Sequence, residues 1–166
     1  PALSTVLFSD LRSFTHIPVT LGAQGTVTLL NEYFDVMVEA ISEQGGMVDK
    51  FIGDAIMAGF GIPLAHDDDE DRGVRAGINM IKRLWDWNSL RESDGKPPVE
   101  MGLGLNTDKV VSGNIGSSKR MDYPMIGDGL NLAARLESAC QSSSATLPTS
   151  DITYQRLHVT YHITYI

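Results

Sequence analysis

Short apolar runs alternate with amphipathic stretches along the chain. Residues 4–9 form a brief run, rich in β-branched and aromatic side chains, that ends at Asp10, and this pattern favours a buried strand. Residues 22–44 then carry apolar side chains at a spacing of about 3.6 residues, which predicts a helix. Gly45 and Gly46 follow this stripe, and glycine is the usual residue just beyond a helix C-terminus.

A hairpin is predicted next. Residues 47–52 and 55–60 are two short apolar runs separated only by Gly53 and Asp54. A two-residue loop with glycine first suits a type II′ turn between antiparallel strands. The rest of the pattern predicts, in chain order, an acidic run over 66–71, a helix over 74–85, a loop over 88–98, strands over 100–105 and 110–115 joined through 106–109, a helix over 129–140, a Ser-rich connector over 142–144 and a strand over 158–166.

The predicted order of elements is β-α-β-β-α-β-β-α-β. It is close to a ferredoxin-like βαββαβ core with extra strands and helices, which belongs to the α+β class. The sequence has no internal repeat and no long low-complexity segment, and its 166 residues suit one domain over 1–166.

The net charge of the chain bears on which molecules it can bind. The formal net charge is −8, from 13 Lys and Arg against 21 Asp and Glu. This balance argues against a nucleic-acid binder, whose affinity rests on clustered basic side chains that neutralise phosphates. It does not exclude a small phosphorylated substrate, because a bound cation supplies positive charge locally.

Cys140 is the only cysteine, so the chain forms no intramolecular disulfide and suits a reducing compartment. No run of about 18 apolar residues predicts a transmembrane helix. The start of the chain also lacks the pattern of a signal peptide. Because the chain begins with Pro1, we expect a piece of a longer protein whose catalytic part is cytoplasmic and makes no membrane contact of its own.

Asp10 and Asp54 are the first candidates for chemistry. Asp10 ends an apolar strand and Asp54 lies at the tip of the predicted hairpin, so both reach one edge if these strands share a sheet. Two neighbouring carboxylates either share a proton or bind a cation, and Mg²⁺ and Mn²⁺ prefer such oxygen ligands. Each aspartate also fits an ordinary role in a turn, and spacing alone leaves both interpretations open.

Asn131 and Arg135 are four residues apart in the third predicted helix, so they share one face of it. An amide next to a guanidinium suits a sugar oxygen and a phosphate, although the same pair also fits a solvated helix face. Lys50 stands between apolar residues of a predicted strand, which is typical of an edge strand or of a surface lysine.

Other polar features have simpler interpretations. The acidic run over 66–71 fits a first helical turn that complements the helix dipole. His66, His158 and His162 lack the spacing of metal ligands. Cys140 fits a packed residue at a helix end.

Three blocks of sequence carry a resemblance. They cover 8–15, 48–58 and 126–137, and read FSDLRSFT, VDKFIGDAIMA and IGDGLNLAARLE. Together they resemble the catalytic domain of class III nucleotide cyclases, with the bacterial and cyanobacterial adenylyl cyclases most similar, and the likeness runs from about residue 4 to 157. The resemblance implies the class III cyclase fold and an adenylyl cyclase, a phosphorus-oxygen lyase that converts ATP to 3′,5′-cyclic AMP and pyrophosphate.

The resemblance also implies a metal site. In the family two aspartates hold two divalent cations, Mg²⁺ or Mn²⁺, and the matching positions are Asp10 and Asp54. The backbone carbonyl of Leu11 matches a further metal contact. Such cations activate the 3′-hydroxyl for in-line attack on the α-phosphorus and neutralise the leaving triphosphate end.

The remaining implied positions bind substrate. Lys50 matches the residue that reads the purine, where lysine implies adenine. Asn131 matches the asparagine that orients the ribose, Arg135 the arginine on the α-phosphate, and Lys119 a basic position near the triphosphate. The family works as a head-to-tail homodimer in which one chain supplies the aspartates and the other supplies Lys50, Asn131 and Arg135. Regulatory domains on the same longer chain are further implied partners.

Three positions depart from the family pattern. Pro124 stands where the family has Asp or Thr as a second adenine contact, so base selection would rest on Lys50 and backbone groups. Asp108 stands where a turn glycine is common, and residues 158–166 hold no Lys or Arg to match the family's triphosphate-binding lysine. A guanylyl or dual-specificity cyclase, and a non-catalytic nucleotide-binding or dimerisation module, are the alternatives.

Overall fold

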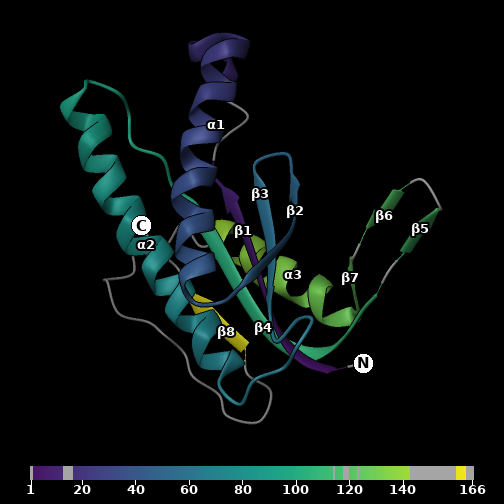
Figure 1. The fold of residues 1–166 in the computed structure, drawn as a ribbon. Helices are drawn as coiled ribbons and strands as arrows, with labels where there is room; N and C mark the ends of the chain where they lie inside the picture. Colours follow the sequence, from purple (N-terminus) through teal and green to yellow (C-terminus); the bar gives the residue numbers. More distant parts are fainter. Residues whose placement is uncertain are drawn as a thin grey trace.

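The computed structural model describes residues 2–12, 17–113, 115–117, 120–122, 124–142 and 160–163. Its elements, drawn in Figure 1, are β1 (Ala2–Leu11), α1 (Ile17–Glu43), β2 (Met47–Ile52), β3 (Ala55–Phe60), α2 (Asp69–Ser93), β4 (Met101–Ser112), β5 (Ile115–Ser117), β6 (Arg120–Asp122), β7 (Met125–Ile126), α3 (Asp128–Ser142) and β8 (Thr160–Ile163). The predicted βαββαβ core is contained in this order.

The main sheet has the strand order β2-β3-β1-β4-β7, and β8 also pairs with β4. The pairs β2–β3, β3–β1 and β1–β4 are all antiparallel. Two βαβ units, β1-α1-β2 and β3-α2-β4, therefore interleave, because each places one strand between the two strands of the other. This split arrangement is the ferredoxin-like one, which confirms the predicted α+β class.

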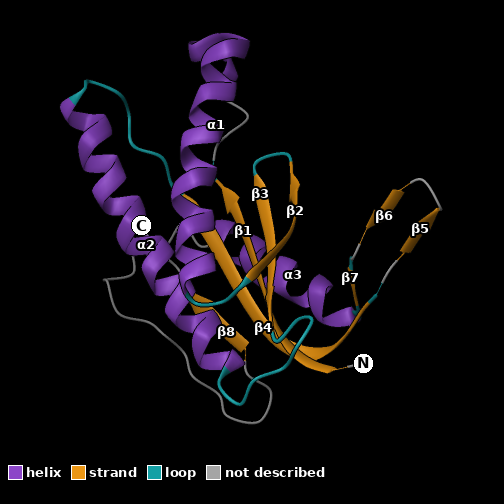
Figure 2. Ribbon diagram, viewed as in Figure 1, coloured by secondary structure: helices purple, strands orange, loops and turns teal. Residues whose placement is uncertain are grey.

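Each face of the sheet has its own apolar core, because successive strand residues point to opposite sides. Figure 2 shows α1 and α2 side by side on one face, where Leu7, Ile56 and Phe60 belong to the larger cluster. Val6 and Ala133 belong to a smaller cluster on the opposite face, which α3 covers. The end of β1 that carries Asp10 therefore lies in a sheet packed from both sides.

Glycines mark two of the predicted turns. Gly45 has a φ of 73° just after α1, and Gly53 has a φ of 62° between β2 and β3. Both angles lie in the left-handed region, where a residue without Cβ is preferred. The predicted helix end and the predicted hairpin over residues 47–60 are confirmed.

Two further glycines bring α3 directly onto β4. A Cβ at position 104 would overlap the carbonyl oxygen of Ala133 and lie 2.7 Å from the backbone nitrogen of Glu137. A Cβ at position 102 would overlap the Glu137 carboxylate. Because the obstacles at position 104 include backbone atoms, a larger residue there would have to displace the helix.

The prediction of separate strands over 100–105 and 110–115 is wrong. These residues belong mostly to one strand, β4, and every residue of β1 has a partner on it. Residues 106–109, predicted to connect two strands, lie inside β4, because partners elsewhere in the fold satisfy polar side chains there. Asn106, for example, donates from Nδ2 to the carbonyl oxygen of Gly129 at 3.2 Å.

The predicted loop over 88–98 is wrong in its first half, because α2 continues to Ser93. Asn88 lies on the helix and makes two hydrogen bonds with the backbone of Val99, at 2.8 and 2.9 Å. Arg91 donates from Nε to the carbonyl oxygen of Pro97 at 3.0 Å. These polar residues hold the returning chain against the helix.

The other boundaries differ less. α1 begins at Ile17 and is interrupted at Gly22, so its regular part matches the predicted helix. β8 covers the centre of the predicted strand over 158–166, whose remaining residues lie outside the described ones. β5 and β6 form a two-stranded ribbon that extends away from the main sheet in Figure 1, and the sequence pattern did not predict it.

Candidate active site

Asp10 and Asp54 meet at one end of the main sheet. Asp10 is the last residue but one of β1, and Asp54 lies in the turn between β2 and β3. Because β3 pairs with β1 up to Ser9 and Ile56, the hairpin turn lies beside the end of β1. The Asp54 side chain lies close enough to raise the pKa of the Asp10 carboxyl group, so the structure brings together the two candidate metal ligands.

The acidic side chains at this end of the sheet repel one another. Burial raises the pKa of the Asp10 carboxyl group to about 7, and the hydrogen bond and negative charge of Asp54 contribute in the same direction. The negative charge of Glu137 adds to the shift, while a hydrogen bond from the backbone of Leu11 opposes it. These effects disfavour the charged form of Asp10, and a bound cation would offset them.

Glu137 and Tyr33 are two titratable groups near this pair that the sequence did not single out. Glu137 is buried on the sheet-facing side of α3, with its carboxylate over Gly102, the residue paired with Asp10. Tyr33 is buried on α1, and burial raises the pKa of its hydroxyl group, with the charges of Asp10 and Asp54 acting in the same direction. The sequence points to Glu137 only through its position in the third block of the resemblance, and it gives no such indication for Tyr33.

The residues at this end of the sheet fit a divalent cation. Oδ1 of Asp10 is buried and has no hydrogen-bond partner, which leaves a carboxylate oxygen for a ligand. Oxygen ligands from two carboxylates and a carbonyl suit Mg²⁺ or Mn²⁺, which keeps other positions for water and phosphate. Among the described residues no group of three or more His, Cys, Asp and Glu is arranged to hold a metal ion.

Lys50 lies on β2, the edge strand, with about half of its side chain exposed. Its Nζ lies 3.3 Å from Oδ2 of Asp49, while Oδ1 of Asp49 accepts a hydrogen bond from the backbone nitrogen of Met125 at 3.3 Å. Pro124 directly precedes Met125 and is half-buried. The two positions expected to select the base, Lys50 and Pro124, are thus linked through Asp49.

Asn131 and Arg135 lie on the outer side of α3. Ala133 and Glu137 face the sheet and are buried, whereas Asn131 and Arg135 are exposed. Asn131 and Arg135 are each two residues from Ala133, about 200° around the axis at 3.6 residues per turn. They therefore point away from the sheet and from the Asp10 carboxylate. Lys119 lies outside the described residues.

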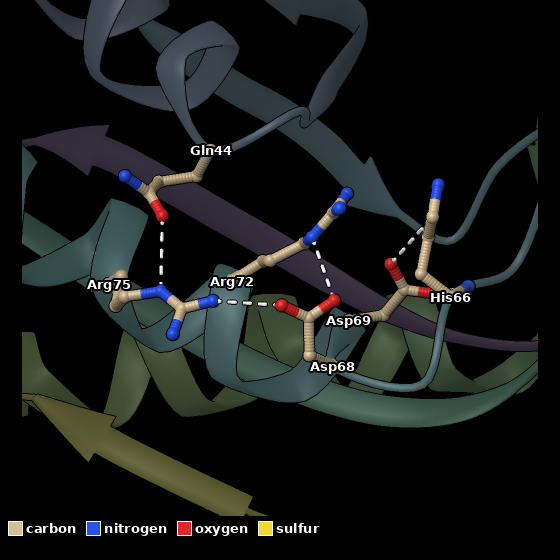
Figure 3. Close-up of polar contacts among 6 residues, drawn as sticks. All are labelled: Gln44, His66, Asp68, Asp69, Arg72 and Arg75. Carbon is tan, nitrogen blue, oxygen red and sulfur yellow. Dashed lines mark hydrogen bonds and ion pairs between the residues drawn. The ribbon is translucent and has the colours of Figure 1, made fainter.

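The acidic run lies at the start of α2, as predicted, and two of its aspartates, Asp68 and Asp69, have polar partners (Figure 3). Asp68 contacts Nε of Arg72 at 2.9 Å and the guanidinium of Arg75 at 3.1 Å. Asp69 is buried, and its two oxygens face the backbone nitrogen of His66 at 2.7 Å and its ring Nδ1 at 3.3 Å. These contacts hold the start of α2 and the loop before it together, so Asp68 and Asp69 have structural roles.

The domain is thus a ferredoxin-like α+β fold in which two aspartates lie together at one end of the sheet, while Asn131 and Arg135 lie on the outer side of α3. Residues 3–165 match the adenylate and guanylate cyclase catalytic domain, and the chain belongs to this family.

Individual relatives agree with this assignment. The chain is 36% identical over 137 residues to an adenylate cyclase of Anabaena cylindrica, a match that covers 80% of this chain and 26% of that protein. It is also similar to the adenylyl cyclase CyaB from P. aeruginosa, with a TM-score of 0.77 and 39% identity over 82% of this chain and 71% of that one. The guanylyl cyclase Cya2 has a TM-score of 0.79 and 33% identity, over 96% and 90% of the two chains.

The chain spans 26% and 20% of the length of two curated relatives that it matches, from Anabaena cylindrica and Rhizobium meliloti. In the described part of the chain, no helix combines the length and the apolarity needed to cross a membrane.

Proposed function

We propose that this domain is an adenylyl cyclase, which converts ATP to 3′,5′-cyclic AMP and pyrophosphate. The observation that carries the proposal is the pair of carboxylates, Asp10 and Asp54, at the end of the sheet. Its position on β1 and on the β2–β3 turn fits a cation site for a triphosphate. Similarity to the adenylate cyclase of Anabaena cylindrica and to CyaB supports adenine as the base.

Asp10, Asp54 and the carbonyl of Leu11 would hold two divalent cations, Mg²⁺ or Mn²⁺. The fit rests on the free buried oxygen of Asp10 and on the mutual repulsion of the two carboxylates. When bound, the cations lower the pKa of the 3′-hydroxyl group and neutralise the triphosphate.

The other residues bind and orient the substrate. In the reaction a bond forms between the 3′-oxygen and the α-phosphorus while the bond to pyrophosphate breaks. Arg135 would stabilise the charge that grows on the α-phosphoryl oxygens, since its planar fork of donors suits a phosphate. Asn131 would hold the ribose so that the 3′-oxygen is in line with the leaving group, which matters because the two ends belong to one flexible molecule.

The site would be completed by a second copy of the chain. Asn131 and Arg135 are exposed and point away from Asp10, so one chain alone does not place them on a triphosphate held by its own aspartates. A head-to-tail homodimer resolves this separation, because the aspartates of one copy face the α3 surface of the other. Each dimer would then contain two equivalent sites.

Base selection would rest on Lys50, because Pro124 offers no side-chain donor or acceptor and no backbone N–H. The loss of this second contact, together with similarity to the guanylyl cyclase Cya2, makes a guanylyl or dual-specificity cyclase the second candidate. A non-catalytic module that binds nucleotide is the candidate from a different class.

A paired assay separates these candidates. The protein is incubated with ATP or GTP and Mn²⁺ across a dilution series, and both cyclic products are measured. Cyclic AMP as the main product, with a specific activity that falls on dilution, supports the proposed homodimer. Cyclic GMP in excess favours the guanylyl candidate, and nucleotide binding by a folded dimer without either cyclic product favours the non-catalytic module.

Lys50→Glu tests the proposed base reader. An ammonium group only donates hydrogen bonds whereas a carboxylate only accepts them, so the change reverses what the side chain offers to the purine. We expect kcat/KM for ATP to fall and the preference between ATP and GTP to move toward GTP. An unchanged preference in the folded variant would reject Lys50 as the reader.

A further inference from the structure

Asp49 is a buried carboxylate that touches both sides of the proposed base-reading region. Only 3% of its side chain is exposed, compared with 46% for Lys50. Oδ2 lies 3.3 Å from Nζ of Lys50, and Oδ1 accepts a hydrogen bond from the backbone nitrogen of Met125 at 3.3 Å. Burial of a carboxylate is unfavourable unless charge and hydrogen-bond partners compensate it, so these two contacts stabilise its position.

An irregularity in β2 makes this contact possible. The pairing of β2 with β3 shifts between Val48 and Lys50, which leaves Asp49 as an extra residue without a partner on β3. In a regular strand the side chains of Asp49 and Lys50 would point to opposite faces. A bulge redirects one of them, and here it allows neighbouring side chains to form an ion pair.

The hydrogen bond between Asp49 and the backbone of Met125 holds the chain next to Pro124 in place. Met125 follows Pro124, and its backbone N–H is bonded to Asp49. Gly59 on β3 allows Met125 to pack closely against this strand, because a Cβ at position 59 would lie 2.5 Å from the sulfur of Met125. Pro124 and the start of β7 are thus held against β2 and β3, next to Lys50.

We propose that Asp49 is a positioning residue for base selection, which holds the Lys50 ammonium group and the backbone at Pro124 in one fixed arrangement. The inference rests on the proposed function, in which Lys50 reads the purine. Because Pro124 removes a side-chain contact to the base, discrimination depends on where one ammonium group is held. Asp49 supplies that constraint without touching the nucleotide.

Asp49→Asn separates this role from a structural one. The amide oxygen of asparagine can still accept the hydrogen bond from Met125, but its NH₂ group then faces the Lys50 ammonium group. The structural tie to Met125 is kept while the ion pair is lost. If Asp49 served only to hold the backbone before β7, asparagine would replace it without a change in base preference.

The experiment measures kcat and KM of the full chain for ATP and GTP with Mn²⁺. We expect Asp49→Asn to lower the ratio of kcat/KM for ATP to that for GTP by about tenfold, the size expected for one charge-assisted contact. The change should fall mainly on KM for ATP. Asp68→Asn is the matched control, because Asp68 also loses ion pairs, with Arg72 and Arg75, but lies at the start of α2.

A double variant and a binding measurement test the same role of Asp49. Asp49→Asn added to Lys50→Met should leave the ratio where Lys50→Met alone puts it, because coupled residues are not additive. Binding of 3′-deoxy-ATP and 3′-deoxy-GTP, which cannot cyclise, should show the same loss of preference. If the unmodified protein makes no cyclic product, the proposed function fails, and the binding ratio still tests Asp49. An equal loss for both nucleotides, or no loss, overturns the inference.

Discussion

The carboxyl group of Asp10 lies close enough to the side chain of Asp54 for Asp54 to raise its pKa, although the helix α1 and the strand β2 separate them in the chain. The ferredoxin-like connection explains the contact, because β1 and β3 are direct neighbours in the sheet and the β2–β3 turn follows the end of β1. The repulsion between the two carboxylates is relieved by a proton or by a cation. The proposed reaction uses the second possibility.

Asp54→Asn is expected to remove the response to cations. In the unmodified protein, a cation at about 100 times its Kd adds about 2.7 kcal/mol to the free energy of unfolding. The variant should show no such rise in Tm with Mn²⁺, while its Tm without cation should be equal or higher because one negative charge beside Asp10 is gone. Turnover should fall on the order of 10²-fold or more. Thermal melts with and without Mn²⁺ check this, and an unchanged Mn²⁺ response would contradict the metal site.

Arg135→Ala is expected to remove activity without loss of stability. The side chain is exposed on α3, and such surface substitutions change the free energy of unfolding by about 0.5 kcal/mol or less. The rate should fall on the order of 10²-fold, as for a lost donor to a developing charge. Lys82→Ala, another exposed basic residue on a helix, is the matched control. Near-full activity of Arg135→Ala, with the dimer intact, would show that the residue does not contact the α-phosphate.

Gly104→Ala is expected to destabilise the domain by about 2–3 kcal/mol, the upper part of the range of about 1–3 kcal/mol for an overpacked site. The added Cβ would overlap backbone atoms of α3, so the helix that carries Asn131 and Arg135 must move. Gly113→Ala is the control, because a Cβ at that position meets nothing within 4 Å. Denaturant unfolding of both variants measures the difference. Equal stability of the two would show that α3 does not rest on β4 as described.

The sequence predicts the core of the fold well because its signals are local. The helix stripe over 22–44, the glycines at 45 and 53, and the apolar runs of β2 and β3 each depend on neighbouring residues. The strand β4 was predicted as two strands because its polar centre is stabilised by distant partners. Thr107 Oγ1, for instance, lies 2.8 Å from Thr5 Oγ1, a contact that exists only after β1 and β4 pair.

The candidate site likewise contains residues that the sequence pattern predicts and residues that it does not. Asp10 and Asp54 could be placed together from the sequence because a strand end and a hairpin tip define their positions. Glu137 and Asp49 could not, since their roles depend on close packing of α3 over Gly102 and on a bulge in β2. Neither feature has a pattern that is visible in one sequence.

The central claim is that the active site is shared between two copies of the chain, and mixing two inactive variants tests it most directly. Asp54→Asn lacks the cation half and Arg135→Ala lacks the phosphate half. When the two are mixed in equal amounts and allowed to exchange, about half of the dimers are mixed and one of their two sites is intact, so cyclic AMP formation should return to about a quarter of the unmodified rate. Mixing Asp54→Asn with Asp10→Asn is the control and should restore nothing, because both sites then lack an aspartate. No recovery in the first mixture, with exchange of subunits verified, would contradict a shared site.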